Sequence, residues 1–197
     1  MSVKDQKPNI LPAWTDVIVR FVPRDGREVR EREMILSLIA RDGDALLRRE
    51  NDFAHMTASS IIVSRDRKKT LMAYHRIYDS WAWTGGHADG ECDFEAVARR
   101  EAQEETGIRG LVRLGEGAAS VEILPVWAHV KRGQHVGSHL HLNVSYLFEA
   151  DDTLDLRVAQ DENSAVGWID TDKLEEYVSE PPMMPVYKKL LMRANDC

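Results

Sequence analysis

The spacing of apolar residues changes along the chain and divides it into two parts. Between residues 27 and 40, apolar positions recur at helical spacing, and residues 45–51 continue with a second, shorter helical pattern. Upstream, prolines and a glycine surround one short β-like run at residues 16–22, which predicts an irregular arm with a single strand. We therefore expect an amino-terminal arm and helical extension over residues 1–53, and the main domain over residues 54–197.

Strand patterns dominate the second part of the chain. Residues 57–64 and 70–75 flank a charged turn and predict a hairpin. Residues 138–150 alternate strictly, so one face of this predicted strand carries Leu140, Leu142, Val144, Tyr146 and Phe148. Its opposite face carries His139, His141, Asn143 and Ser145. Further strands are predicted near residues 120–130 and 165–169, and helices near residues 171–178 and 186–194. Helices that interrupt a mixed or antiparallel sheet predict an α+β fold.

Composition and charge narrow the classes of function. The 197-residue chain has a formal net charge of -7, which argues against broad binding to a nucleic-acid backbone. No apolar run approaches the length of about 18 residues that a membrane helix needs, and the first ten residues contain no apolar signal segment. We therefore expect a cytoplasmic protein without a membrane span. Cys92 and Cys197 lie far apart in the sequence, so reduced thiols are expected.

One predicted helix, residues 93–106, carries acid on its apolar side. On a helical wheel that starts at Phe94, Glu101 and Glu105 each lie about 20° from the reference. Glu104 lies about 80° away on the same wheel. The stripe that is apolar in the first half of the helix therefore becomes carboxylate in the second half.

The helix alone leaves two interpretations of this acidic stripe open. Unpaired buried carboxylates cost several kcal/mol each, so the stripe must end in water or meet cations. A predicted glycine turn, Gly85 and Gly86, precedes the helix and lets the backbone approach a ligand closely. Three convergent oxygen donors suit Mg²⁺, whereas no grouping of histidine and cysteine along the sequence matches a zinc cage. These features favour a magnesium site.

The stretch from Gly86 to Ile108 resembles the Nudix box, whose pattern is G, five residues, E, seven residues, R-E-(apolar)-x-E-E-x-G-(apolar). Gly86 matches the opening glycine. The closing half matches in register at Arg100, Glu101, Ala102, Glu104, Glu105, Gly107 and Ile108. Cys92 stands at the position of the first glutamate, and Glu91 and Glu95 are the neighbouring acids that can substitute for it. The resemblance extends over roughly residues 54–178.

This resemblance implies an α/β/α sandwich around a mixed sheet, with hydrolysis of a diphosphate (pyrophosphate) bond in a nucleoside diphosphate-linked or related small molecule. It implies Mg²⁺ as the cofactor, with Mn²⁺ as an alternative. Glu101 and Glu105 are then direct metal ligands, and Glu104 is a ligand or takes part in proton transfer. The backbone of Gly85 is a further candidate ligand. Structural roles in the box fall to Gly86, Arg100 and Gly107.

Residues outside the box complete the predicted site. Glu162, in the loop before the strand at 165–169, is the candidate for a later catalytic acid, while the general base is left open between the box and such a loop. His87 follows the glycine pair and is a candidate phosphate contact. His139 and His141 share one strand face, which either lines the substrate cleft or is the wet side of an edge strand. Structural or surface roles are assigned to His55, His75 and His129.

Two other functions remain open at this point. The replaced first glutamate is compatible with a Nudix-fold sensor that binds its ligand without cleaving it. An isopentenyl diphosphate isomerase-like enzyme shares the fold but requires a cysteine and an acid in a context that Cys92 does not match. In every case the expected partner is a small diphosphate molecule, and a homodimer is left open.

Overall fold

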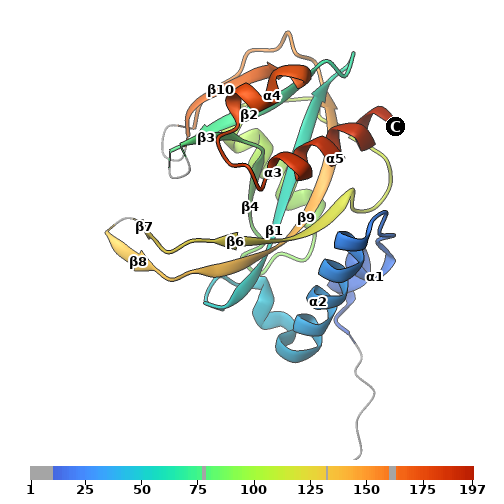
Figure 1. Cartoon of the computed structure of the whole chain (residues 1–197), viewed down its shortest axis with the longest axis vertical. Coiled ribbons are helices and arrows are strands. Elements are labelled where there is room, and N and C mark those ends of the chain that lie inside the picture. The colour runs from blue at the N-terminus through green and yellow to red at the C-terminus, as the bar shows by residue number, and fades with distance from the viewer. Residues whose placement is uncertain (1–10, 77–78, 132, 160–162) are drawn as a thin grey trace, which may run out of the picture.

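A mixed β-sheet forms the middle layer of the molecule, which the computed structural model describes over residues 11–76, 79–131, 133–159 and 163–197 (Figure 1). Its strands are β1 (Ala54–Ser64), β2 (Lys69–His75), β3 (Ser80–Ala82), β4 (Thr84–His87), β5 (Val112–Leu114), β6 (Ser120–Val126), β9 (His139–Ala150) and β10 (Asn163–Asp170). The main path runs β10-β2-β1-β9-β5, while β3, β4 and β6 pair with β2, β1 and β9 respectively. Only the β1–β9 pair among these described strands is parallel, which confirms the mixed sheet.

Helices cover both faces of this sheet (Figure 1). The helical elements are η1 (Ala13–Thr15), α1 (Asp16–Arg20), α2 (Gly26–Asp42), η2 (Gly43–Leu47), α3 (Phe94–Thr106), η3 (Thr171–Lys173), α4 (Leu174–Tyr177) and α5 (Met184–Asn195). Side chains alternate along β1, so Met56 joins a core cluster with Val97 of α3, whereas Ile61 joins a second cluster with Leu190 of α5. This arrangement confirms the expected α+β sandwich. Within the described ranges, no helix has both the length and the apolar character needed to span a membrane.

Strand β9 has the predicted alternation of apolar and polar residues, but it is not the edge strand that one of the two interpretations of its histidine face requires. Leu142, Val144 and Phe148 are buried in the core that includes α3. Asn143 and Ser145, on the opposite face, are also buried. The reason is that β9 lies between β1 and the strands β5 and β6, so it is a central strand. The interpretation of its histidine face as the wet side of an edge strand is therefore wrong.

The amino-terminal segment is more helical than its local sequence indicates. The run at residues 16–22 contains helix α1 rather than a strand. Trp14, Ile18 and Phe21 are buried in one cluster, and their spacing of four and three residues matches one helical face, which outweighs the β-propensity of the valines and isoleucine. Helix α2 forms as predicted, whereas the second predicted helix is only the 3₁₀ segment η2.

A buried cluster of four charged residues joins α2 to the rest of the molecule. Glu28 of α2 and Glu122 of β6 are both fully buried, and Lys189 of α5 lies 2.9 Å from the first and 3.0 Å from the second. Arg193 of α5 donates hydrogen bonds of 2.6 and 2.9 Å to the two carboxylate oxygens of Glu28. We call these four residues the buried charge cluster. It ties the segment before residue 54 to the last helix of the chain.

The stability of the protein should depend on the charge of Glu28. Burial would raise the pKa of this carboxyl, but hydrogen bonds from Arg193, from the Arg24 backbone N–H and from Lys189 lower its pKa from 4.5 to about 2. A pKa below the unfolded value means that the stabilisation is complete above about pH 4.5 and is lost as the pH falls towards 2. Linkage predicts a loss of about 2 kcal/mol between pH 7 and pH 3.

Urea unfolding at these two pH values measures this effect. Glu28→Gln should remove the corresponding part of the pH dependence, although it also lowers stability at pH 7. Glu33→Gln, which changes an exposed acid on the same helix, should retain the wild-type pH dependence. An unchanged pH dependence in Glu28→Gln would contradict the assignment of the loss to this carboxyl.

Candidate active site

Helix α3 begins and ends where its sequence predicts. The side chain of Asp93 caps its first turn by accepting a hydrogen bond of 3.0 Å from the N–H of Ala96. At the other end, Gly107 has a φ of 71°, and its N–H binds the carbonyl of Gln103. Phe94 and Val97 are buried in the core, so the first half of the helix is anchored by its apolar stripe. This anchoring directs the carboxylates of the second half towards strand β4.

The glycine pair before α3 lies in a strand and not in a turn, which corrects the sequence interpretation. Gly85 and Gly86 belong to β4, where they pair with Ser59 and Ala58 of β1. A side chain at Gly85 would meet the backbone of β1, because a Cβ there would lie 2.7 Å from the carbonyl oxygen of Ala58. A Cβ at Gly86 would lie 2.6 and 2.7 Å from the carboxylate oxygens of Glu101. Glycine is thus required by close approach on both sides of β4.

The three box carboxylates differ in exposure and in their partners. Glu105 is only 6% exposed, and its two oxygens accept hydrogen bonds from the N–H of Gly85, at 2.9 Å, and from Nδ2 of Asn163, at 2.8 Å. The Glu101 carboxylate lies against Gly86. The side chain of Glu104 is 64% exposed at the end of the stripe. The acidic stripe therefore runs from a buried, hydrogen-bonded carboxylate to a solvated one.

Arg100 links the box to the acid that precedes Cys92. Its guanidinium donates a hydrogen bond of 2.6 Å to Glu91 and lies 3.4 Å from a carboxylate oxygen of Glu101. Its Nε atom is farther from Glu104, at 4.0 Å from a carboxylate oxygen. Cys92 itself is exposed. Of the neighbouring acids, Glu91 is therefore the one that reaches the box arginine.

Glu95, the other acid near Cys92, lies away from the glycine pair. It forms ion pairs of 3.2 Å with Arg99 and with Arg113. Among the described residues, no ion pair or hydrogen bond connects Glu95 to the box glutamates. It therefore provides a control position on the same helix.

The donor set at the glycine pair fits a hard divalent cation. Glu101 and Glu105 supply carboxylate oxygens beside adjacent residues of β4, and Glu104 adds an exposed carboxylate within one helical turn. Oxygen-only donors of this kind suit Mg²⁺ or Mn²⁺ better than zinc. Glu162, the predicted later acid, lies outside the described residues.

Replacement of Gly86 by alanine should reduce activity without unfolding the protein. The new Cβ would displace the Glu101 carboxylate, which is the end of a flexible side chain, so the loss of stability should stay below about 1 kcal/mol. A misplacement of about 1 Å at a reacting group can lower turnover by roughly a hundredfold. Turnover and thermal melting should be measured together. Gly26→Ala, where a Cβ meets no atom within 4 Å, should keep wild-type turnover.

A group of histidines gathers on the sheet face opposite α3. The parallel register places His55 of β1 directly beside His141 of β9. The ring of His55 has its centroid 4.9 Å from that of His87, 4.8 Å from that of His139 and 5.0 Å from that of His141. The structure thus brings together His87, His139 and His141, the three predicted substrate contacts. It adds His55, which sequence reasoning placed among the structural or surface residues.

The sequence pattern shows no grouping of histidines of the kind that binds zinc, but the folded structure brings three histidines together. Candidate ligand atoms of His55, His139 and His141 all lie within 4.8 Å of one another. His55 precedes His139 by 84 positions in the sequence, so only the pairing of β1 with β9 brings it to His139 and His141. In the sequence, only the alternation that places His139 and His141 on one strand face pointed to this group, and it did not identify His55.

Burial and mutual proximity favour the neutral form of His55 and His141. Burial, followed by the charges of His87, His55, His139 and His129, lowers the pKa of His141 to about 2. Burial also lowers the pKa of His55, against a hydrogen bond to the carbonyl of Asn51. Neutral imidazoles present lone pairs that can accept a proton, a hydrogen bond or a metal ion.

The fold and the box identify the family. The family model described as NUDIX domain matches residues 54–193, which is most of the chain. The chain belongs to the Nudix family. Helices α1 and α2 precede the matched region, and the box lies inside it. The family match therefore confirms the resemblance carried by Gly86 and the residues from Arg100 to Ile108.

Three proteins that are similar to this chain are named as hydrolases. The CMP-5'-(N-acetyl-N-hydroxy-3-aminopropyl)phosphonate hydrolase of Streptomyces rubellomurinus (strain ATCC 31215) is 43% identical over 65 residues, covering 30% of this chain. The match spans about a third of that relative, 32% of its length. An Ap4A hydrolase from C. elegans shows the same fold, with a TM-score of 0.52 and 18% identity over 72% of this chain and 95% of that one. A NUDIX family hydrolase from Clostridium perfringens has a TM-score of 0.48 and 18% identity, covering 70% and 96% of the two chains.

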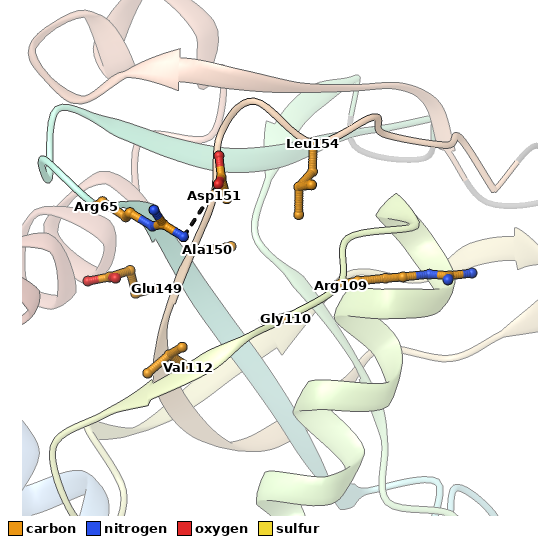
Figure 2. A pocket seen from close by; sticks show the side chains of 8 residues that line it. All are labelled: Arg65, Arg109, Gly110, Val112, Glu149, Ala150, Asp151 and Leu154. Atoms are coloured by element: carbon orange, nitrogen blue, oxygen red, sulfur yellow. Dashed lines mark ion pairs between the residues drawn. The ribbon is translucent and has the colours of Figure 1, made fainter.

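The pocket shown in Figure 2 lies apart from the Nudix box. Its charged lining residues are Arg65, Arg109, Glu149 and Asp151, and an ion pair of 3.4 Å joins Arg65 to Asp151. The pocket contains none of the box glutamates and none of the clustered histidines. Its location beside the carboxyl end of β9 and the loop after α3 gives it no contact with the candidate metal ligands. We therefore do not assign it to catalysis.

Proposed function

We propose that this Nudix protein is a Mg²⁺-dependent hydrolase that cleaves a diphosphate bond in a nucleoside diphosphate-linked or related small molecule. The observation that carries this proposal is the placement of Glu101 and Glu105 beside the β4 glycines, one against Gly86 and the other on the N–H of Gly85. The presence of Glu101, Glu104 and Glu105, the three glutamates of the closing half of the box, supports hydrolysis over binding alone.

The chain prepares this site by fixing two carboxylates before any ligand binds. Gly85 and Asn163 orient the Glu105 carboxylate, and Arg100 holds Glu101 from the side of Glu91. Glu101, Glu104 and Glu105, with the backbone of Gly85 as a further candidate, would hold the divalent ion. When bound, such an ion neutralises phosphate oxygens and lowers the pKa of water. Water is the nucleophile in this scheme, and the exposed Cys92 has no role in it.

We infer a nucleotide group in the substrate from the name of a relative and not from the residues of the site. The Streptomyces relative is named for a CMP-linked phosphonate, and its match with this chain is confined to 65 residues. We therefore place CMP-linked phosphates and phosphonates first in a substrate series, followed by nucleotide sugars, dinucleotides, nucleoside triphosphates and prenyl diphosphates.

A ³¹P NMR screen of this series with Mg²⁺ tests the proposal. The expected result is cleavage of at least one diphosphate compound into two phosphorus-containing products, with no cleavage after chelation of the metal. Saturable binding without turnover across the series would instead support a Nudix-fold sensor. Isomerisation of isopentenyl diphosphate, seen in the same spectra, would support the isomerase-like alternative.

A further inference from the structure

The histidine group contains a feature that diphosphate hydrolysis at the box does not use. His55 is 4% exposed, and its Nε2 atom has no hydrogen-bond partner among the residues that the structure describes. A buried polar atom without a partner is costly unless a ligand satisfies it. The rings of His139 and His141 lie beside that of His55, with centroids 4.8 and 5.0 Å away. A ligand that accepts an electron pair from this nitrogen, such as a metal ion, would satisfy it.

Backbone carbonyls orient two of these rings. Nδ1 of His55 lies 3.1 Å from the carbonyl oxygen of Asn51, and Nδ1 of His139 lies 2.9 Å from that of Gly137. A carbonyl oxygen only accepts, so each Nδ1 carries the hydrogen and each Nε2 keeps its lone pair. Metal-binding histidines in proteins are held in the same way, with the second ring nitrogen donating to a carbonyl or carboxylate.

The spacing of two ring nitrogens, which lie within hydrogen-bond distance of each other, also matches a bound ion. Nε2 of His139 lies 3.2 Å from Nε2 of His141. Two imidazole nitrogens bound to one tetrahedral zinc ion, each at about 2.0–2.1 Å, are separated by about 3.3 Å. The candidate ligand atoms of His55, His139 and His141 all lie within 4.8 Å of one another. His139 and His141 are partly exposed, which gives an ion access from solvent.

We propose that His55, His139 and His141 form a second metal site, which binds Zn²⁺ or a similar borderline transition-metal ion and leaves a fourth position for water. Three neutral imidazoles suit zinc, copper, nickel and cobalt and do not suit Mg²⁺, which prefers oxygen. Three protein ligands with one open position is the arrangement of catalytic rather than structural zinc sites. The site shares no ligand with the Nudix box, because Glu101 and Glu105 lie on the α3 side of β4.

His87 adds a further ring beside this site. It lies on β4, paired with Thr57, and its ring centroid is 5.0 Å from that of His141. It directly follows Gly86, whose neighbour across the sheet face is Glu101. His87 therefore lies beside both the ring of His141 and the glycine that contacts Glu101.

Metal titration of the full-length protein tests the proposal independently of hydrolysis. Protein freed of metal with a chelator is titrated with Zn²⁺ in the presence of excess Mg²⁺, which occupies the carboxylates. We expect one Zn²⁺ per chain and a rise in Tm on binding. Loss of an outer hydrogen bond alone typically weakens metal binding by 10–100-fold, so His139→Gln and His55→Gln should each weaken it by at least about a hundredfold.

Matched variants distinguish this site from other ligands. His135→Gln changes an exposed histidine of β8 (Gln134–Val136), whose partner strand is β7 (His129–Lys131), and should leave Zn²⁺ binding unchanged. Glu101→Gln should also leave it unchanged, even if it abolishes hydrolysis. Zn²⁺ binding that is lost in Glu101→Gln but retained in His139→Gln would overturn the proposal, as would binding of less than one ion per chain by the wild type.

A measurement on the wild type protects the test against misfolding of the His55 variant. Co²⁺ should give the visible absorption bands of a four-coordinate ion, and added Zn²⁺ should remove them. In ¹⁵N spectra of labelled histidine, Zn²⁺ should shift the Nε2 signals of three residues. Spectra typical of six-coordinate Co²⁺ with unshifted histidine signals would contradict the assignment.

Discussion

Replacing Glu101 with glutamine should lower Mg²⁺-dependent turnover by about a hundredfold to several thousandfold, because one charged metal ligand is worth roughly 3–5 kcal/mol in the transition state. The folded structure should change little. The Glu101 carboxylate lies against Gly86 and only 3.4 Å from Arg100, so the amide can occupy the same space. Turnover should be measured at saturating Mg²⁺ beside thermal melting.

Glu95→Gln is the matched control on the same helix. It removes one negative charge from α3, but Glu95 pairs with Arg99 and Arg113 away from the β4 glycines. Turnover should stay within about twofold of the wild type, and stability should fall by less than about 1 kcal/mol. If Glu95→Gln lost as much activity as Glu101→Gln, the metal would have to lie elsewhere on α3.

Glu105 is a less suitable position for this test, and here the structure reverses an expectation drawn from charge alone. Repulsion between Glu101 and Glu105 suggests that Glu105→Gln should hold or raise the stability of the metal-free protein. The two oxygens of Glu105, however, accept hydrogen bonds from Gly85 and Asn163. A glutamine presents an NH₂ group to one of these donors, which leaves a buried donor unsatisfied. Loss of activity in Glu105→Gln would therefore mix catalysis with stability.

Replacing Arg193 with methionine should destabilise the protein by about 3–5 kcal/mol, because it leaves the fully buried Glu28 with only one of its two cationic partners. Such a loss is a large fraction of the 5–15 kcal/mol that is typical of folded domains. Urea unfolding at pH 7 measures it directly. The effect should appear although Arg193 lies at the last matched residue of the family model and far from the box.

Two further variants separate the buried charge cluster from surface ion pairs. Lys188 lies on α5, as Arg193 does, and forms an exposed ion pair with Glu175 of α4. Lys188→Met breaks this pair and should lower the free energy of unfolding by less than about 1 kcal/mol. The double variant Glu28→Gln with Arg193→Met should be less destabilised than the sum of its single changes, because both charges are then removed together. Strict additivity would indicate that the two side chains do not interact.

Several features of this protein follow from its sequence alone. The apolar alternation of β9 and the helical spacing of α3 need no distant partner, because periods of 2 and 3.6 residues are local properties of the backbone. The ends of α3 are likewise local, since Asp93 and Gly107 act on N–H groups of their own helix. The acidic stripe of Glu101, Glu104 and Glu105 is a further consequence of the helical period. These local patterns predicted the α+β fold, whereas the box was identified by its resemblance to the Nudix pattern.

The tertiary structure decided what local patterns do not contain. The sequence indicated Gly85 and Gly86 as a turn, but pairing with β1 places them in strand β4. Glycine is needed there because a side chain would collide with Ser59 at the first position and with Glu101 at the second.

The same limit applies to contacts between distant segments. Asn163 reaches Glu105 across 58 residues, and Glu28 reaches Arg193 across 165. Hydrogen bonds and ion pairs at such separations depend on the register of the sheet and the packing of α2 and α5. His55 joins His139 and His141 for the same physical reason: parallel pairing of β1 with β9 sets two segments side by side that share no sequence period.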